Sequence, residues 1–341
     1  MRHAAFCCLL GFVVGCDRPA GPEPVELGHL ATAATRDDEA RGVELALADV
    51  NASGPVLRVR EAPAGPTPEA AAAQGTRLFA LNKVRGLIGP GTATAADRVR
   101  AQAEGGVVVA LSGWTGSPPP ANLFGLGVAP AERGRVLALT AKQILGGKAG
   151  KVLVVRDPAA VSAGAAADRF ARDCGAFAAV TESRPGVRPA DAGVVFFATP
   201  AAVALEHRGL YPAAALLFGD EEAELPALQP GGDGFVFVTP YDLTATTGFA
   251  NRYRDKYQRE PTVAAALAYD ALTLWAEVGR RANGFDPAAV RAELLKRETP
   301  FESLSGPLTF ADDHTARRKV FVTRTKDGRR TTEAYDPEPA K

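Results

Sequence analysis

Hydrophobic residues follow two different periods along this chain, and their alternation predicts a mixed α/β protein. Apolar runs without polar interruption, such as residues 107–111 and 152–155, are typical of parallel strands that are covered on both faces. Between such runs, apolar residues recur three or four positions apart, as at Val43, Leu47 and Val50, and this spacing predicts helices with one buried face. Strands and helices that alternate in this way form doubly wound parallel sheets.

The predicted elements fall into two consecutive sets and a tail. The first set has strands at residues 25–30, 56–60, 87–88, 107–111 and 124–128, and helices that begin near Thr35, Pro68, Thr94 and Pro130. The second set restarts at Lys151, with strands at 152–155, 176–181, 194–198, 216–218 and 235–238 and a helix at 162–174. Helices that begin near 249, 262 and 287 follow, and the tail has strands at 307–310, 320–325 and 331–335. Each of the two sets is expected to form a lobe of its own.

Local turn and cap signals support several of these elements. Thr35 has Asp38 three residues later, which is the spacing of a capping box at a helix start. Thr67 precedes Pro68, a proline at the first position of a helix. The pair Asp327-Gly328 between the last two predicted strands is a signal for a tight β-hairpin.

The first residues of the chain have the features of a targeting segment. Arg2 is a minimal positive region, residues 4–14 are an apolar stretch too short to span a bilayer, and Val13-Val14-Gly15-Cys16 resembles a bacterial lipobox. We therefore expect a lipoprotein signal peptide at residues 1–16, lipidation of Cys16, and a tether at residues 17–24. The other interpretation is an ordinary secretory signal that is cut elsewhere.

Composition and charge narrow the possible functions. The 341 residues are 46% hydrophobic, which is enough for two lobes that each bury a core. Lys and Arg number 39, as do Asp and Glu, and no basic tract occurs, which argues against a nucleic-acid partner. Cleavage before Cys16 would leave Cys174 as the lone cysteine, and a lone cysteine makes no internal disulfide.

The chain lacks the motifs that indicate an enzyme. The glycine-rich run at 146–151 departs from the spacing of a phosphate loop at Leu145, and Val152 stands where Ser or Thr is needed. The sequence has no G-x-S-x-G elbow, no H-E-x-x-H, and no G-x-G-x-x-G after its first predicted strand. Its four histidines are isolated from one another, so no metal site is expected. We expect a protein without catalytic residues, metal or cofactor.

Hydroxyl side chains gather where two predicted strands end. Strand 87–88 is followed by Thr92 and Thr94, and strand 107–111 is followed by Ser112 and Thr115. In open α/β sheets ligands bind at the carboxyl ends of the strands, because helix N-termini there offer unpaired N–H groups and the positive end of a dipole. The sequence therefore predicts a site for a small polar or anionic ligand in this region.

Five stretches of the chain, taken in order, resemble the branched-chain amino-acid binding proteins of ABC importers, which are type I periplasmic binding proteins. They are RGVELALADVNASG at 41–54, GLIGPGTAT at 86–94, the loop spacing of 157–164, the aromatic pattern of 249–271, and GPLTF at 306–310. Together they extend over nearly the whole chain after the tether. The resemblance implies two Rossmann-like lobes, a hinge of three crossover strands, and a ligand in the cleft between the lobes.

The resemblance also implies where the lobes begin and end. On the family's pattern the crossings fall near residues 128–131, 239–243 and 303–305. Lobe one would then consist of residues 25–130 and 242–304, and lobe two of residues 131–241 and 305–336. Closure of the two lobes around a ligand would be a hinge motion.

Two loops of lobe one carry ligand contacts in the family. Residues Thr92, Ala93 and Thr94 match the loop that contacts a ligand carboxylate, although Thr92 or Thr94 can instead serve only as a helix cap. Ser112, Trp114 and Thr115 match the next loop, which is one residue shorter here than the family's usual spacing. Trp114 either lines the cleft or fills the core beneath it.

Lobe two and the hinge supply the remaining candidate ligand contacts. Val161 stands where the family commonly has Tyr, so the ligand is more apolar on that side or the pocket is degenerate. Asp220 or Glu221, just after a predicted strand, would accept from a ligand ammonium group, unless this acidic run is simply solvated surface. Tyr241 lies at a predicted crossing and either reaches the ligand or stacks within the hinge.

These features predict an extracytoplasmic, periplasmic solute-binding protein that is anchored to the membrane by a lipid. It would capture an amino acid, amide or small carboxylate between its lobes and deliver it to an ABC permease. The alternative is a non-transporting sensor or regulatory lipoprotein with the same fold and a degenerate pocket. Val161 and the shortened loop at Trp114 keep this alternative open.

Overall fold

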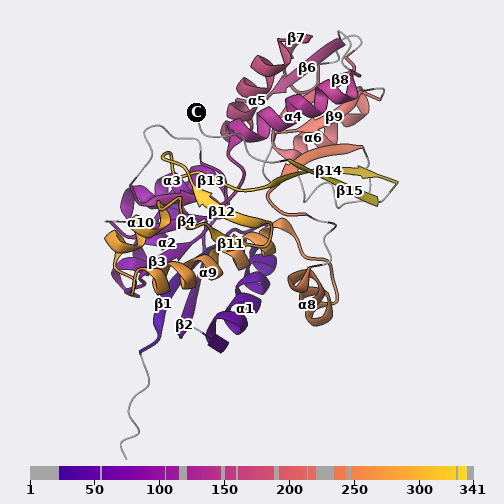
Figure 1. Cartoon of the computed structure of the whole chain (residues 1–341). Helices are drawn as coiled ribbons and strands as arrows, with labels where there is room; N and C mark the ends of the chain where they lie inside the picture. The colour runs from indigo at the N-terminus through magenta and orange to yellow at the C-terminus, as the bar shows by residue number, and fades with distance from the viewer. Residues whose placement is uncertain are drawn as a thin grey trace, which may run out of the picture.

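The computed structural model describes residues 23–53, 56–103, 105–114, 121–146, 150–158, 160–187, 192–212, 214–219, 234–242, 244, 247–327 and 329–335. In it the chain forms two α/β lobes, one at the lower left and one at the upper right of Figure 1. Each lobe has its own sheet, as the two predicted sets of elements require. Within the residues that are described, no helix is long and apolar enough to cross a membrane.

Lobe one is built on five parallel strands in the order β2-β1-β3-β4-β5. These strands are β1 (Val25–Ala31), β2 (Leu57–Pro63), β3 (Gly86–Ile88), β4 (Val107–Ala110) and β5 (Leu123–Gly125). Helices α2 (Pro68–Ala80) and α3 (Ala93–Gln102) pack on one face, and α1 (Arg36–Ser53), α9 (Val263–Arg281) and α10 (Pro287–Leu294) pack on the other. Every residue of β3 and β4 is therefore buried, which explains why their sequences show no polar alternation.

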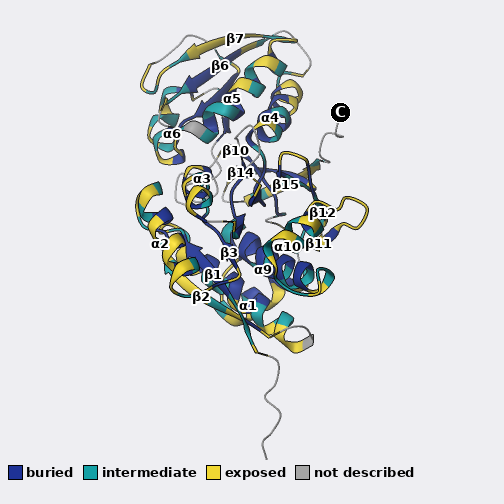
Figure 2. Ribbon diagram, turned by 90° about the vertical axis from the view of Figure 1, so that its left-hand side faces the viewer, coloured by how far each residue is buried: buried dark blue, intermediate teal, exposed yellow. Residues whose placement is uncertain are grey.

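Lobe two is built on seven strands in the order β15-β14-β10-β9-β8-β6-β7. These strands are β6 (Gly150–Arg156), β7 (Ala178–Ser183), β8 (Val194–Ala198), β9 (Ala215–Phe218), β10 (Phe235–Thr239), β14 (Val320–Lys326) and β15 (Arg329–Tyr335). Helices α4 (Pro130–Ile144) and α5 (Val161–Cys174) cover one face, while β7 at the sheet's edge is partly exposed (Figure 2). Cys174 at the end of α5 is buried, and burial raises the pKa of its thiol to about 12.

The predicted hairpin in the tail is confirmed. Strands β14 and β15 pair antiparallel from Val320 opposite Tyr335 to Lys326 opposite Arg329. Asp327 has φ of 52°, the positive value that the first residue of a tight two-residue turn needs. The short helix α6 (Ala201–His207), the 3₁₀ turn after it (Arg208–Leu210) and strand β13 (Ala316–Arg317) were not predicted from the sequence.

The third crossing differs from the expectation. The chain leaves lobe one after β5, returns after β10 toward helix α8 (Gly248–Tyr257), and enters lobe two again at residues 318–319, not at 303–305. Strands β11 (Phe301–Ser303), β12 (Gly306–Phe310) and β13 form a small sheet that packs on lobe one. Leu308 and Phe310 lie in the core of lobe one, which places residues 305–317 with that lobe, whereas we expected them in lobe two.

A buried ion pair marks this third crossing. The Arg318 Nη2 atom donates to Asp270 Oδ2 of α9 at 2.6 Å, and both side chains are 2% exposed. Arg318 also donates to Ser303 and Ser305, and the Leu304 N–H donates to Asp270 Oδ1. The pair therefore joins a helix of lobe one to the segment that leads into lobe two.

Candidate functional site

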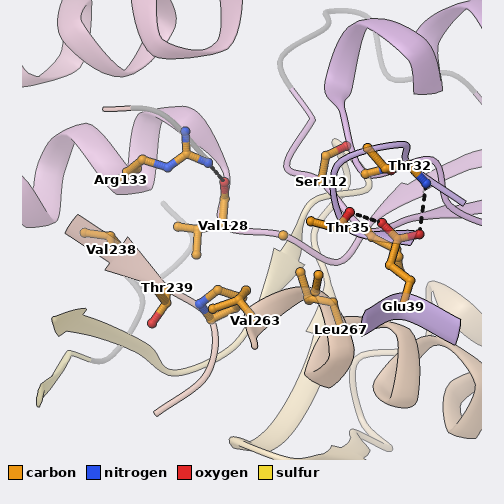
Figure 3. Close-up of a pocket in the computed structure, with 15 residues that line it drawn as sticks. Thr32, Thr35, Glu39, Ser112, Val128, Arg133, Val238, Thr239, Val263 and Leu267 are labelled. Carbon is orange, nitrogen blue, oxygen red and sulfur yellow. Dashed lines mark hydrogen bonds between the residues drawn. The ribbon is translucent and has the colours of Figure 1, made fainter. Parts of the chain in front are cut away.

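A cavity lies at the carboxyl ends of the lobe-one strands, facing α4 and β10 of lobe two (Figure 3). Its volume is about 690 Å³ when the part open to solvent is included. The walls come from the loops after β1, β3 and β4, from α1, α4 and α9, and from the first two crossings. The lining residues are Thr32, Thr35, Glu39, Gly91, Leu111, Ser112, Gly127, Val128, Arg133, Val238, Thr239, Pro240, Val263, Ala264 and Leu267.

The loop after β1 supplies the most strongly polar wall. Glu39, in the first turn of α1, is 1% exposed and lies in contact with the cavity. Its Oε2 atom is 3.0 Å from His29 Nε2. Oε2 also accepts from the Thr32 N–H at 3.1 Å, and Oε1 accepts from the Thr35 hydroxyl (Figure 3). The Thr32 hydroxyl oxygen in turn accepts from the Gly91 N–H at 2.8 Å, which joins the loops after β1 and β3.

The opposite wall belongs to lobe two and the crossings. Arg133 of α4 is 1% exposed and donates to the carbonyl oxygens of Val128 at 3.1 Å and Gly219 at 2.8 Å. Thr239, at the end of β10, donates its hydroxyl to the Tyr241 carbonyl oxygen at 2.7 Å. Residues of the first and second crossings are thus held by side chains that also face the cavity.

Ser112 is a polar side chain of the cavity whose hydroxyl has no hydrogen-bond partner in the described part of the chain. It follows β4 and is 3% exposed. An unsatisfied hydroxyl that is buried costs about 1–3 kcal/mol. A ligand atom or an ordered water that bonds to Ser112 in this cavity would remove that cost.

The remaining walls are largely apolar. Leu111, Val128, Val238 and Leu267 present hydrocarbon surface to the cavity, and the first turn of α9, with Val263 and Ala264, closes one side. The N-terminus of a helix is the positive end of its dipole and favours an anionic group. The cavity therefore suits a small molecule that combines an apolar part with a few polar groups.

The structure brings only part of the predicted site to this cavity. Ser112 lines it, whereas Thr92, Ala93 and Thr94 do not. Thr92 occupies the N-cap position of α3, without a side-chain cap hydrogen bond, and Ala93 is buried. Thr94 lies within the first turn of α3 with its side chain exposed, because the helix begins one residue earlier than predicted.

Two aromatic candidates belong to cores and not to the cavity wall. Trp114 is 7% exposed and packs in the core between the lobe-one sheet and helices α2 and α3, where the Arg100 guanidinium lies 5.7 Å from its ring centre. It therefore fills the core beneath the loop. Tyr241 is 2% exposed and meets the ring of Phe249 edge-on at 6.0 Å, which is the stacking interpretation. Burial raises the pKa of the Tyr241 hydroxyl.

The structure does not describe the side chains of the remaining predicted site residues. Val161 is the first residue of α5, and its side chain is not described. Thr115, Asp220, Glu221 and Cys16 lie outside the described residues. No group of His, Cys, Asp and Glu side chains in the described part of the chain has the arrangement of a metal site.

Sequence reasoning missed five polar residues of the cavity, one of them Thr239 at the end of β10. Thr32, Thr35 and Glu39 come from the first loop, and Arg133 comes from α4. Thr35 and Glu39 were overlooked because capping signals alone account for polar residues at a helix start. The available signal was the loop's position, since the rule that ligands bind at strand ends applies to β1 as well as to β3 and β4.

Comparisons with known proteins agree with this architecture. Residues 187–330 match the model of a family described as periplasmic binding protein. The branched-chain amino-acid transporter substrate-binding protein LivJ from Streptococcus pneumoniae, solved with isoleucine, is 21% identical with a TM-score of 0.78 and covers 92% of this chain and 100% of its own. The leucine-binding protein LivK from Thermotoga maritima is 18% identical with a TM-score of 0.77, covering 92% and 99%.

Another solved structure on this fold holds a different ligand. A solute-binding protein of an ABC transporter from R. palustris, in complex with benzoate, is 18% identical with a TM-score of 0.74, covering 94% of this chain and 98% of its own. Comparison of the sequence with curated proteins gives no match. This chain therefore shares the fold of these solute-binding proteins along more than nine-tenths of its length, and its residues 187–330 match the family described as periplasmic binding protein.

Proposed function

We propose that this protein is the extracytoplasmic solute-binding component of an ABC importer for a small solute that has a carboxylate or amide group, such as an amino acid. The solute binds in the cavity between the lobes and no bond is made or broken. Ser112 carries the proposal, because its buried hydroxyl faces a cavity and has no protein partner among the described residues. The apolar walls and the first turn of α9 support a solute with a hydrocarbon part and an anionic end.

Movement of the lobes is part of the proposal. The cavity is lined by lobe one, by lobe two and by residues of two crossings, so a hinge motion would open and close it. A bound solute favours the closed form to the extent that it contacts both lobes only in that form. The closed form is the one that we expect an ABC permease to recognise.

A thermal-shift screen tests the proposal directly. Amino acids, their amides and small carboxylates including benzoate are added to the purified protein, and a solute that binds only the folded state must raise the melting temperature. Solutes that raise it are then measured by calorimetry. Absence of any shift or heat would contradict the proposal and favour a regulatory protein that binds no solute.

Replacing Ser112 with Ala should weaken binding of the solute by about 3–100-fold, the range for a lost hydrogen bond to a neutral amide or a charged carboxylate. The stability of the solute-free protein should stay equal or rise slightly, because the unsatisfied hydroxyl is removed. Thr94→Val is the matched control, since Thr94 is exposed on α3 and does not line the cavity. If Thr94→Val loses affinity and Ser112→Ala does not, the solute binds at the loop of residues 92–94 and not in this cavity.

We also propose that Cys16 is lipidated and holds the protein at the membrane surface. The support is the sequence Val13-Val14-Gly15-Cys16, which resembles a lipobox. Cys16→Ser should move most of the protein from the membrane fraction to the soluble extracytoplasmic fraction, as measured by immunoblotting after fractionation. Cys174→Ser, at a buried cysteine in α5, is the control and should leave the distribution unchanged. Equal membrane association of Cys16→Ser would refute the anchor.

A further inference from the structure

The carboxylate in the cavity wall belongs to lobe one and is held in a fixed orientation. Glu39 contacts three separate groups: the His29 ring, the Thr32 backbone N–H and the Thr35 hydroxyl. An ionised carboxylate only accepts hydrogen bonds, so the His29 Nε2 atom carries the proton in this contact.

The contacts of Glu39 leave one acceptor position open. A carboxylate has about four lone-pair sites, two on each oxygen. Oε2 accepts from His29 and from Thr32, whereas Oε1 accepts from Thr35 alone among the described residues. Thr35 gives its hydroxyl proton to Glu39, and its oxygen remains an acceptor that also lines the cavity. This wall therefore presents acceptors to a solute.

A positively charged N–H group is the partner that such a wall favours. Hydrogen bonds to ionised acceptors are stronger than neutral ones, and a protonated amine has three N–H donors to share between Glu39 and Thr35. A solute carboxylate at the same place would face like charge at close range inside a site of low dielectric constant. The Ser112 hydroxyl, which has no partner among the described residues, can donate to a solute carboxylate instead.

We infer that Glu39 selects solutes that carry a protonated amine and rejects carboxylates that lack one. The inference rests on the proposed function, because it specifies which small carboxylate-bearing solutes enter the cavity. It differs from the expectation drawn from the sequence, in which an acidic residue of lobe two, Asp220 or Glu221, meets the ammonium group. Here the cation binds to the first turn of α1 in lobe one.

Matched pairs of probes measure this selection by isothermal titration calorimetry. Leucine is compared with isocaproate, and phenylalanine with hydrocinnamate, so that each pair differs only in the amine. For at least one pair the wild-type protein should bind the amino acid about 10–100-fold more tightly, which is the range expected for a hydrogen bond to a charged group. Glu39→Gln should reduce this preference to a few-fold or less, and the affinity for the amine-free partner should stay equal or rise.

Two further variants make the test specific. Glu26→Gln is the matched control, since Glu26 lies on the same first strand as His29 and pairs with Arg60 at 3.7 Å outside the cavity. It should retain the full preference. If Glu39→Gln does not fold, Glu39→Asp replaces it in the test. Its carboxylate keeps the charge but lies one methylene group farther from the solute, so the preference for the amino acid should decrease.

The outcomes separate this inference from the proposed function. The role of Glu39 is refuted if amine-free acids bind the wild-type protein as tightly as amino acids do. It is also refuted if both Glu39 variants keep the preference for amino acids. In either case the proposed solute binding is unaffected. Binding by neither member of any pair and by no other solute of the screen would overturn the proposed function, and the inference with it.

Discussion

Replacing Arg318 with Met should lower the free energy of unfolding by about 3–5 kcal/mol, the typical cost of breaking a buried ion pair by removing one partner. The cost arises because Asp270, 2% exposed, would keep its charge without its counter-ion, and because Ser303 and Ser305 would lose a shared donor. Urea unfolding followed by circular dichroism measures the loss. Reduced cooperativity between the lobes would appear in the same experiment as a broader or two-step transition.

The loss in Arg318→Met should also depend on pH. Burial raises the pKa of the Asp270 carboxyl, and the Arg318 charge opposes that rise. Without Arg318 the pKa rises further, and a folded-state pKa above the unfolded value destabilises the protein as pH rises through it. The variant should therefore lose less stability at about pH 5 than at about pH 8, where the carboxylate is fully ionised.

Two comparisons isolate the buried pair. Arg252→Met removes an exposed pair with Asp49, in which the side chains are 48% and 34% exposed, and should cost at most about 1 kcal/mol. The double variant Arg318→Met with Asp270→Leu should recover much of the loss, since no uncompensated charge remains. A loss below about 1 kcal/mol in Arg318→Met would mean that water replaces the guanidinium and that the third crossing is not fixed by this pair.

The architecture could be predicted from the sequence because the local sequence patterns agree with the burial of each strand in its sheet. Runs such as residues 107–110 are apolar without alternation, and the structure covers both faces of that strand. Strands β14 and β15 pair in the register expected for a two-residue connection, because such connections set the register of their strands, and Asp327 has the positive φ that the first of the two residues needs. The expected fold of two doubly wound lobes is confirmed by both sheets and by the solved structures on the same fold.

Local signals were not sufficient for the third crossing. Buried and more exposed side chains alternate along residues 306–310, as in a strand. This alternation does not specify the lobe in which the buried side chains pack. Leu308 and Phe310 pack in lobe one beside Phe124, a contact across more than half of the chain. The boundary near 318 follows from that long-range packing.

The cavity lies at the end of the sheet where the sequence predicted a site, but most of its lining residues are not the predicted ones. The strand-end rule located the loops after β3 and β4, and Ser112 lies in the cavity. The cavity also needs α9, which returns from residue 263, and a loop contact between Thr32 and Gly91 that spans 59 positions. No local pattern indicates that Glu39 and Leu267 face the same space.

Gly42→Ala should destabilise the protein by about 1–3 kcal/mol and weaken solute binding as well. Gly42 is buried where α1 crosses α9, and a Cβ atom there would lie 2.1 Å from the carbonyl oxygen of Ala265. The obstacle is backbone, so the helices must separate, and this overpacking outweighs the gain of about 1 kcal/mol in helix propensity from glycine to alanine. Movement of α9 shifts Val263 and Leu267, which line the cavity.

Gly164→Ala supplies the matched control for this effect. Gly164 is also helical, in α5, but a Cβ atom there would meet no atom within 4 Å. This substitution should stabilise the protein by about 0.4–1 kcal/mol, since alanine loses less conformational freedom on folding. Thermal unfolding with and without a bound solute distinguishes the two variants. If Gly42→Ala is as stable as the wild type, α1 and α9 can separate with little loss of free energy of unfolding, and the cavity wall that they share deforms easily.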